Sequence, residues 1–238
     1  MSDIPPIPAA TLVVVRDRPA RPPELLMVER ARGMAFAAGA LVFPGGRIDD
    51  EDGEARIAAI RETLEETAIP VGLSPIPSPD TAKALQAQLI GVRQFDELLA
   101  EHRLSLDLDV MTPLARWVPK FHATRRFDTL FFVAREPDGE WHPNVVPGEC
   151  SSALWISAAD ALERERRGKA QLIFPTRRNL ERLALHHSFE AIRADAEAHP
   201  IDPITPWIEA IDGVNFITIP EGIGYPVTRE KLDGLWRG

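Results

Sequence analysis

The chain has 238 residues, of which 45% are hydrophobic and 26% charged, a composition that fits one soluble globular domain with a sizeable addition. Its net charge of −9 disfavours nucleic acid and anionic membranes as partners, and its single cysteine, Cys150, excludes a disulfide framework and a multi-cysteine zinc site. No apolar run approaches the roughly 18–20 residues of a membrane span. The N-terminus lacks the basic start and apolar core of a secretory signal, so we expect a cytoplasmic protein.

The first part of the chain alternates short apolar runs with turns. Residues 11–16 (TLVVVR) and 24–30 (ELLMVER) predict the two strands of a hairpin, joined by a loop rich in proline and arginine at 16–23. Residues 39–46 (GALVFPGG) predict a short strand that runs into a Pro-Gly-Gly break. An acidic loop follows, and then a helix from about Gly53 to Thr67.

The rest of the chain mixes helices and strands. A proline-rich linker leads to a helical segment at 82–103, which we interpret as part of a helical insertion at 74–110. Further elements are strands at 114–120, 126–137 and 151–157, a helix that opens at Ser157, and one or two helices over 175–200. This order predicts an α+β fold arranged as an α/β/α sandwich with a mixed sheet and additional helices.

The helix near residue 60 gathers three glutamates. Glu62, Glu65 and Glu66 fall within an arc of roughly 100°, where like charges repel by a few tenths of a kcal/mol. Oxygen ligands in a cluster suit a hard divalent cation such as Mg²⁺ or Mn²⁺. A solvated acidic face is the alternative. The opposite stripe, expected to face the core, holds Ile57, Ile60, Leu64 and Ala68.

Arg61 lies one helical turn before Glu65. It can pair with that carboxylate, or with an acid of the preceding loop such as Asp52. A donor that holds a ligand carboxylate fixes the geometry of a metal site, so Arg61 and Asp52 are predicted to orient the ligands.

A glycine pair, an acidic loop and the pattern RExxEE resemble the signature of the Nudix hydrolase superfamily. Two departures stand out. Asp52 replaces the usual glutamate, with a gap to Arg61 that is one residue longer than the common form, and Ala68 replaces the usual glycine. Alanine in a left-handed C-cap costs about 1 kcal/mol, so we expect this helix to end differently. The matching positions are Gly46, Asp52, Arg61, Glu62, Glu65 and Glu66.

Further stretches resemble one branch of that superfamily, the coenzyme A diphosphatases of peroxisomal type. They are ELLMVERARGMAFAAGALVFPGG, ARWVPKFHATRRFDTLFFVA, ALWISAADAL and FPTRRNLERLA. The resemblance covers roughly residues 11–69 and 114–185. It implies a single Nudix hydrolase domain over 1–238, with the insertion at 74–110 and a helical C-terminal extension from about 175.

The resemblance implies metal-dependent hydrolysis of a nucleoside diphosphate linked to another group. Coenzyme A or an acyl-CoA is the preferred substrate. ADP-ribose or a nucleoside diphosphate sugar is the closest alternative, and a non-catalytic nucleotide sensor is a third. The implied ligands of Mg²⁺ or Mn²⁺ are Glu62, Glu65, Glu66 and a backbone carbonyl of Gly45 or Gly46. Glu149 is the candidate general base or further ligand, with an exposed loop residue as the alternative.

Four arginines are candidate substrate-binding residues: Arg30, Arg32, Arg125 and Arg126. Arginine forms bidentate contacts with phosphate, although solvated arginines in a turn are the alternative. Trp117 is expected in the core, with stacking on a base as its alternative. The expected partner is a small nucleotide-type diphosphate, and a homodimer is the assembly to test.

Overall fold

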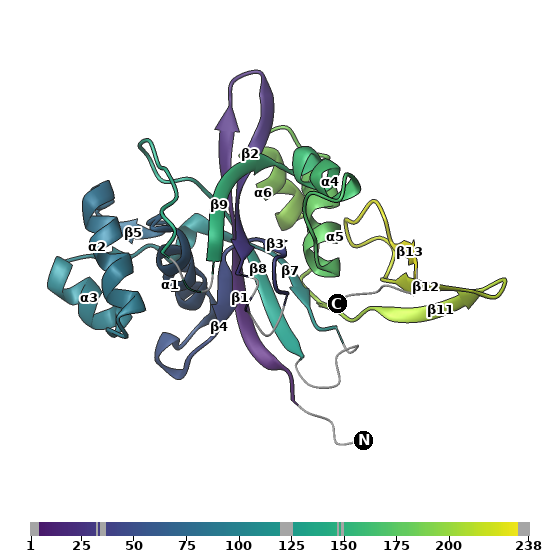
Figure 1. Cartoon of the computed structure of the whole chain (residues 1–238), viewed down its shortest axis with the longest axis horizontal. Coiled ribbons are helices and arrows are strands. Elements are labelled where there is room, and N and C mark those ends of the chain that lie inside the picture. The colour runs from purple at the N-terminus through teal and green to yellow at the C-terminus, as the bar shows by residue number, and fades with distance from the viewer. Residues whose placement is uncertain are drawn as a thin grey trace.

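The computed structural model describes residues 5–31, 33, 37–119, 126–146, 148 and 150–232, and a mixed β-sheet forms its centre (Figure 1). The strand order is β10-β7-β8-β1-β2-β3, with β4 paired to β1 and β9 paired to β2. The β1–β8 and β10–β7 pairs are parallel and the others antiparallel. The strands are β1 (Ile7–Arg18), β2 (Arg21–Arg30), β3 (Leu41–Val42), β4 (Gly45–Arg47), β7 (Met111–Trp117), β8 (Phe127–Arg135), β9 (Cys150–Ser157) and β10 (Pro203–Ile204).

The predicted N-terminal hairpin is confirmed, since β1 and β2 pair antiparallel with Val15 opposite Leu25. The loop expected at 16–23 is only a two-residue turn, because the strands continue to Arg18 and resume at Arg21. Successive side chains of β1 are fully buried on alternate faces of the sheet. A continuous β-branched run of this kind is typical of a strand covered on both sides.

Helices cover the two faces of the sheet, as the predicted α/β/α sandwich requires (Figure 1). One layer contains α1 (Ala55–Thr67), α2 (Pro79–Ile90) and α3 (Phe95–His102), and the other contains α4 (Ala158–Arg166), α5 (Phe174–Leu183) and α6 (Phe189–Glu197). Among the helices that the structure describes, none combines the length and apolar character needed to cross a bilayer.

The helical segment expected over 82–103 consists of two helices, α2 and α3. Ser78 caps α2 by accepting a hydrogen bond from Thr81 N–H, so α2 begins at Pro79, and it ends before Gly91. The short strands β5 (Leu73–Ser74) and β6 (Ser105–Leu106) pair antiparallel and close the base of this segment.

The C-terminal extension expected from about 175 is helical only to Glu197. The chain then returns to the central sheet through β10 and forms a separate antiparallel sheet that projects from the body (Figure 1). Its strands are β11 (Trp207–Ile211), β12 (Val214–Thr218) and β13 (Arg229–Lys231). The strands β11 and β12 have only five residues each, so their alternation of apolar and polar residues is too short to predict a strand.

Candidate active site

The two glycines before α1 let β4 pass between β1 and the acidic helix. A Cβ on Gly45 would collide with the backbone of Ala10 in β1. A Cβ on Gly46 would lie 2.5 Å from Oε1 of Glu62. Glycine is therefore required at 45 for the close approach to β1, and glycine at 46 leaves room for the Glu62 carboxylate against the backbone of β4.

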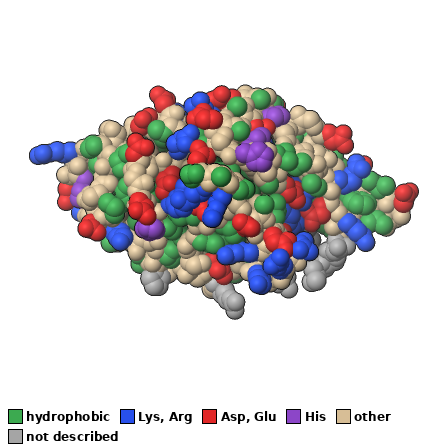
Figure 2. All heavy atoms as spheres, turned by 90° about the horizontal axis from the view of Figure 1, so that it is seen from above, with side chains coloured by type: hydrophobic (Ala, Val, Ile, Leu, Met, Phe, Trp, Pro, Cys, Tyr) green, Lys and Arg blue, Asp and Glu red, His purple; other side chains and the backbone are tan. Residues whose placement is uncertain are grey.

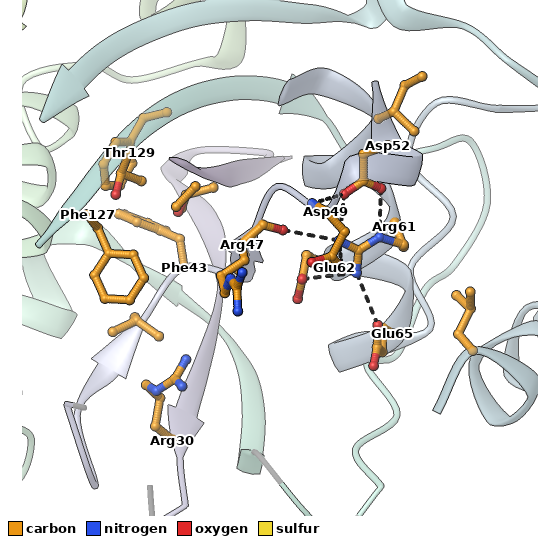
Figure 3. Close-up of a pocket in the computed structure, with 18 of the residues that line it drawn as sticks. Arg30, Phe43, Arg47, Asp49, Asp52, Arg61, Glu62, Glu65, Phe127 and Thr129 are labelled. Atoms are coloured by element: carbon orange, nitrogen blue, oxygen red, sulfur yellow. Dashed lines mark hydrogen bonds and ion pairs between the residues drawn. The ribbon is translucent and has the colours of Figure 1, made fainter. Parts of the chain in front are cut away.

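Arg61 lies at the centre of a hydrogen-bonded cluster (Figure 3). Its Nε and Nη2 donate to the two oxygens of Asp52, both at 2.8 Å, and Nη2 also donates to the carbonyl of Arg47 at 3.1 Å. Its Nη1 donates to Glu62 at 3.0 Å and to Glu65 at 3.5 Å. Both pairings proposed for Arg61 from the sequence are present. Asp52, whose side chain is 3% exposed, accepts the bidentate pair.

Glu66 is a buried carboxylate at the end of the same helix. It accepts a hydrogen bond from Gly45 N–H at 3.1 Å and contacts Cys150 Sγ at 3.5 Å. Burial, reinforced by the neighbouring Glu62 carboxylate, raises the pKa of Glu66 to about 8, while the Gly45 N–H and the positive charge of Arg30 act in the opposite direction. A cation beside Glu66 would stabilise its ionised form.

The donor set around this turn suits Mg²⁺ or Mn²⁺ only in part. Glu62 and Glu66 are close enough for their charges to interact, and both lie against the Gly45–Gly46 backbone. Glu65 instead contacts Arg61 and is one-third exposed. Within the described part of the chain, no three acidic, histidine or cysteine side chains converge as a metal-holding group. The structure therefore brings two of the three glutamates together beside the glycines, while Glu65 contacts Arg61.

A cavity of about 960 Å³ opens beside these residues (Figure 3). We distinguish three walls by chemistry. The charged wall contains Arg30, Arg47, Asp49, Asp52, Arg61, Glu62 and Glu65. The aromatic wall contains Phe43, Trp117, Phe127, Phe131 and Phe174. The aliphatic wall, contributed by the α2–α3 segment and β6, contains Leu89, Ile90, Val92, Leu99 and Leu106.

The candidate substrate-binding arginines differ in position. Arg30 lines the cavity, and its buried Nε has no hydrogen-bond partner among the described residues. Arg126 directly precedes β8, and its backbone carbonyl bonds the first residue of β1. Its side chain is not among the described residues that line the cavity. Arg32, Arg125 and Glu149 lie outside the described residues.

The end of α1 corrects one expectation and reveals two residues that sequence reasoning missed. Ala68 does adopt the left-handed C-cap conformation, with φ 57°, so the expectation of a different ending was wrong. Two polar side chains from outside α1, those of Gln86 and Asn144, lie at this end of the helix. Gln86 had a signal in the sequence, because it is a polar residue on the apolar face of α2, whereas Asn144 had none.

Comparisons with known proteins find relatives of the segment that contains β4 and α1. A family model for the NUDIX domain matches residues 6–87. The Uncharacterized Nudix hydrolase NudL of Cronobacter sakazakii is 48% identical over 62 residues, which are 26% of this chain and 31% of that protein. The protein of the same name from Escherichia coli K12 is 45% identical over 62 residues, which again are 26% of this chain and 31% of that protein. The chain thus spans about a third of the length of the curated relatives it matches.

A solved structure extends the likeness to most of the fold. The crystal structure of a NUDIX hydrolase from Alicyclobacillus acidocaldarius is similar over 81% of this chain and 97% of that chain. The TM-score is 0.71 and the sequence identity 28%. The similarity therefore continues beyond the 6–87 range, into the strands and helices that complete the sandwich.

Proposed function

We propose that this chain, which contains a Nudix domain over residues 6–87, is a metal-dependent pyrophosphohydrolase that cleaves a nucleoside diphosphate linked to another group. The observation that carries the proposal is a buried carboxylate, Glu66, held close to Glu62 beside a cavity of about 960 Å³. Two carboxylates kept together at the cost of burial and repulsion are expected where a cation is to be bound.

The proposed ligands of Mg²⁺ or Mn²⁺ are Glu62, Glu65, Glu66 and the backbone carbonyl of Gly46. Bound there, the ion would neutralise pyrophosphate oxygens, orient them and lower the pKa of a water molecule. Arg61 holds Glu62 through a hydrogen bond of 3.0 Å and is itself anchored on Asp52. The longer 3.5 Å contact of Arg61 with Glu65 is the weakest of the cluster and the easiest to exchange for a metal contact.

The remaining roles concern the substrate. Arg30 presents an unused buried donor in the cavity and is proposed to bind a phosphate oxygen, as are Arg32, Arg125 and Arg126. Glu149 is proposed as the general base, because it immediately precedes Cys150, which contacts Glu66.

Coenzyme A or an acyl-CoA remains the preferred substrate. The sequence resemblance to coenzyme A diphosphatases supports it, and the cavity offers an aromatic wall for a planar base and an aliphatic wall for a long apolar group. ADP-ribose or a nucleoside diphosphate sugar would use the aromatic and charged walls alone. Retention of all three glutamates disfavours a non-catalytic nucleotide sensor.

A substrate panel tests the proposal. Coenzyme A, an acyl-CoA, ADP-ribose, NADH and dinucleoside polyphosphates are incubated with Mg²⁺ or Mn²⁺, and the products are identified by mass. We expect cleavage within the diphosphate of one class, abolished by a chelator. The Glu54→Gln variant is a matched control, because Glu54 is a half-buried acid that pairs with Arg56 at the start of α1 and does not line the cavity. If none of the compounds is cleaved with either ion, the proposal is wrong. Light scattering on the same samples tests for a homodimer.

A further inference from the structure

Two carbonyls in the last turn of α1 accept hydrogen bonds from distant segments of the chain. A helix leaves its last four carbonyls without partners inside the helix, here those of residues 64–67. The carbonyl of Leu64 accepts from Ala68 N–H at 2.8 Å. The carbonyl of Glu65 accepts from Gln86 Nε2 at 2.9 Å, and that of Thr67 from Asn144 N–H at 2.8 Å.

Gln86 is the central residue of this arrangement. It lies on α2, in the helical insertion, and is fully buried among apolar neighbours of the same helix. Its Nε2 also donates to the carbonyl of Asn144 at 2.8 Å, and its Oε1 accepts from Asn144 Nδ2 at 2.6 Å. Every polar atom of the Gln86 side chain is therefore bonded, which is what a buried amide requires and what fixes its orientation.

Asn144 brings a third segment of the chain to this contact. It belongs to the segment 141–146, which leads towards Cys150, and Cys150 contacts the Glu66 carboxylate at 3.5 Å. The Gln86–Asn144 pair thus joins three parts of the chain: the helix that carries Glu65 and Glu66, the insertion, and the segment 141–146.

We propose that Gln86 is a positioning residue for the carboxylates of α1, and that the helical insertion contributes to the active site through it. Gln86 fixes the turn that bears Glu65 and Glu66, and with Asn144 it offsets the strained left-handed conformation of Ala68. This inference rests on the proposed metal-dependent function. The hydrogen bonds of Gln86 to Glu65 and Asn144 are observed in the structure whatever the function is.

The test compares two variants of α2. Gln86→Leu keeps a buried side chain of similar size and removes the hydrogen bonds to Glu65 and Asn144. Leu85→Ala, at the adjacent and equally buried position, weakens the packing of α2 and leaves those hydrogen bonds in place. Three quantities are measured for each: the Mn²⁺ dissociation constant by electron paramagnetic resonance, amide exchange at residues 68–69, and kcat and KM.

We expect Gln86→Leu to weaken Mn²⁺ binding by about 10- to 100-fold, the range for residues that orient metal ligands. Amide exchange at residues 68–69 should accelerate at least about tenfold, and kcat should fall while KM changes less than about threefold. Asn144→Leu should reproduce these effects, and the double variant should add little to either single change. Leu85→Ala should lower the melting temperature but keep the Mn²⁺ dissociation constant within about twofold of the wild type.

The outcomes separate this inference from the proposed function. If Gln86→Leu and Leu85→Ala bind Mn²⁺ equally well and exchange equally fast at residues 68–69, Gln86 has no positioning role. If the wild-type chain binds Mn²⁺ but hydrolyses none of the panel compounds, the proposed hydrolysis is wrong. The change in Mn²⁺ affinity of Gln86→Leu then still decides the role of Gln86.

Discussion

Arg61, which is partly buried, and Arg182, which is fully buried, both lie among carboxylates, but they belong to opposite helical layers of the sandwich. Arg61 borders the large cavity. Arg182, on α5, is 1% exposed and bonds Asp195 and the carbonyl of Leu114, which ties α5 to α6 and β7.

The two clusters also differ in charge balance. Four described carboxylates approach the single guanidinium of Arg61 within 3.5 Å, namely Asp49, Asp52, Glu62 and Glu65. On α5, three arginines share four carboxylates, namely Arg177, Arg178 and Arg182 with Glu165, Glu181, Asp195 and Glu230. An acidic excess beside a cavity favours a bound cation, whereas a nearly balanced cluster that does not line this cavity favours a structural role. Buried charge alone does not distinguish them.

Glu66→Gln should have the largest effect on the acidic cluster. Glutamine keeps an oxygen for the Gly45 N–H and removes the charge, so the fold should persist while Mg²⁺-dependent turnover falls by about a thousandfold or more. Steady-state kinetics and circular dichroism measure the two properties. A variant that retains most of its activity would remove Glu66 from the proposed metal site.

Arg182→Met, in the other helical layer, should reduce stability and leave activity nearly unchanged. The change leaves the Asp195 carboxylate and the Leu114 carbonyl without this buried donor, so we expect a loss of about 3 kcal/mol in the free energy of unfolding. For a chain of this size that corresponds to a fall of roughly 6–12 °C in melting temperature. At a temperature where the variant stays folded, kcat should remain within about twofold of the wild type. A large loss of kcat without loss of stability would contradict the structural assignment.

The sequence was most informative where pattern and local chemistry coincide. The β-branched runs predicted β1 and β2, and the acidic stretch predicted α1 within two residues of its observed limits. The single strand predicted over 39–46 is instead two short strands, β3 and β4, and the glycines expected as a break belong to β4. The C-terminal sheet was missed, because its strands are short and partly exposed and carry weak periodicity. Long-range packing decides such segments, and no local pattern records it.

The candidate site was predictable only within the signature. The spacing of Arg61 and Asp52 anticipated their ion pair, because both residues belong to one loop and helix. The aromatic wall and Asn144 come from segments far apart in the chain, and only the fold brings them to the site. The left-handed Ala68 was unexpected because two of the hydrogen bonds to the last turn of α1 come from distant segments, Gln86 and Asn144.

Arg61→Lys should give a smaller effect than Glu66→Gln at the same cluster. Lysine keeps the positive charge but cannot bond both oxygens of Asp52 while also reaching Glu62. We expect metal affinity and kcat to fall by about 10- to 100-fold with the fold retained. Manganese binding measured together with kcat checks this. Equal Mn²⁺ affinities for wild type and variant would mean that the positive charge alone orders the carboxylates, and that the planar guanidinium of Arg61 is not needed.

Glu181→Gln should give the smallest effect, a change in how stability depends on pH. Burial raises the pKa of Glu181 to about 7, although Arg178 lies 2.9 Å away and acts in the opposite direction, and the nearby Glu230 adds to the increase. Between about pH 4.5 and pH 7 the folded state therefore binds more protons than the unfolded state, so this group lowers stability as pH rises through that window.

Glutamine cannot titrate, so the stability of Glu181→Gln relative to the wild type should increase from pH 5 to pH 8. Urea unfolding at both pH values measures it, and the comparison between variants cancels the titration of Glu66 and other groups. Parallel pH profiles would show that Glu181 titrates normally, and burial would then not perturb this carboxylate. An increase confined to this window would show that Glu181 is shielded from water in the folded protein, whereas the cluster around Arg61 borders the large cavity.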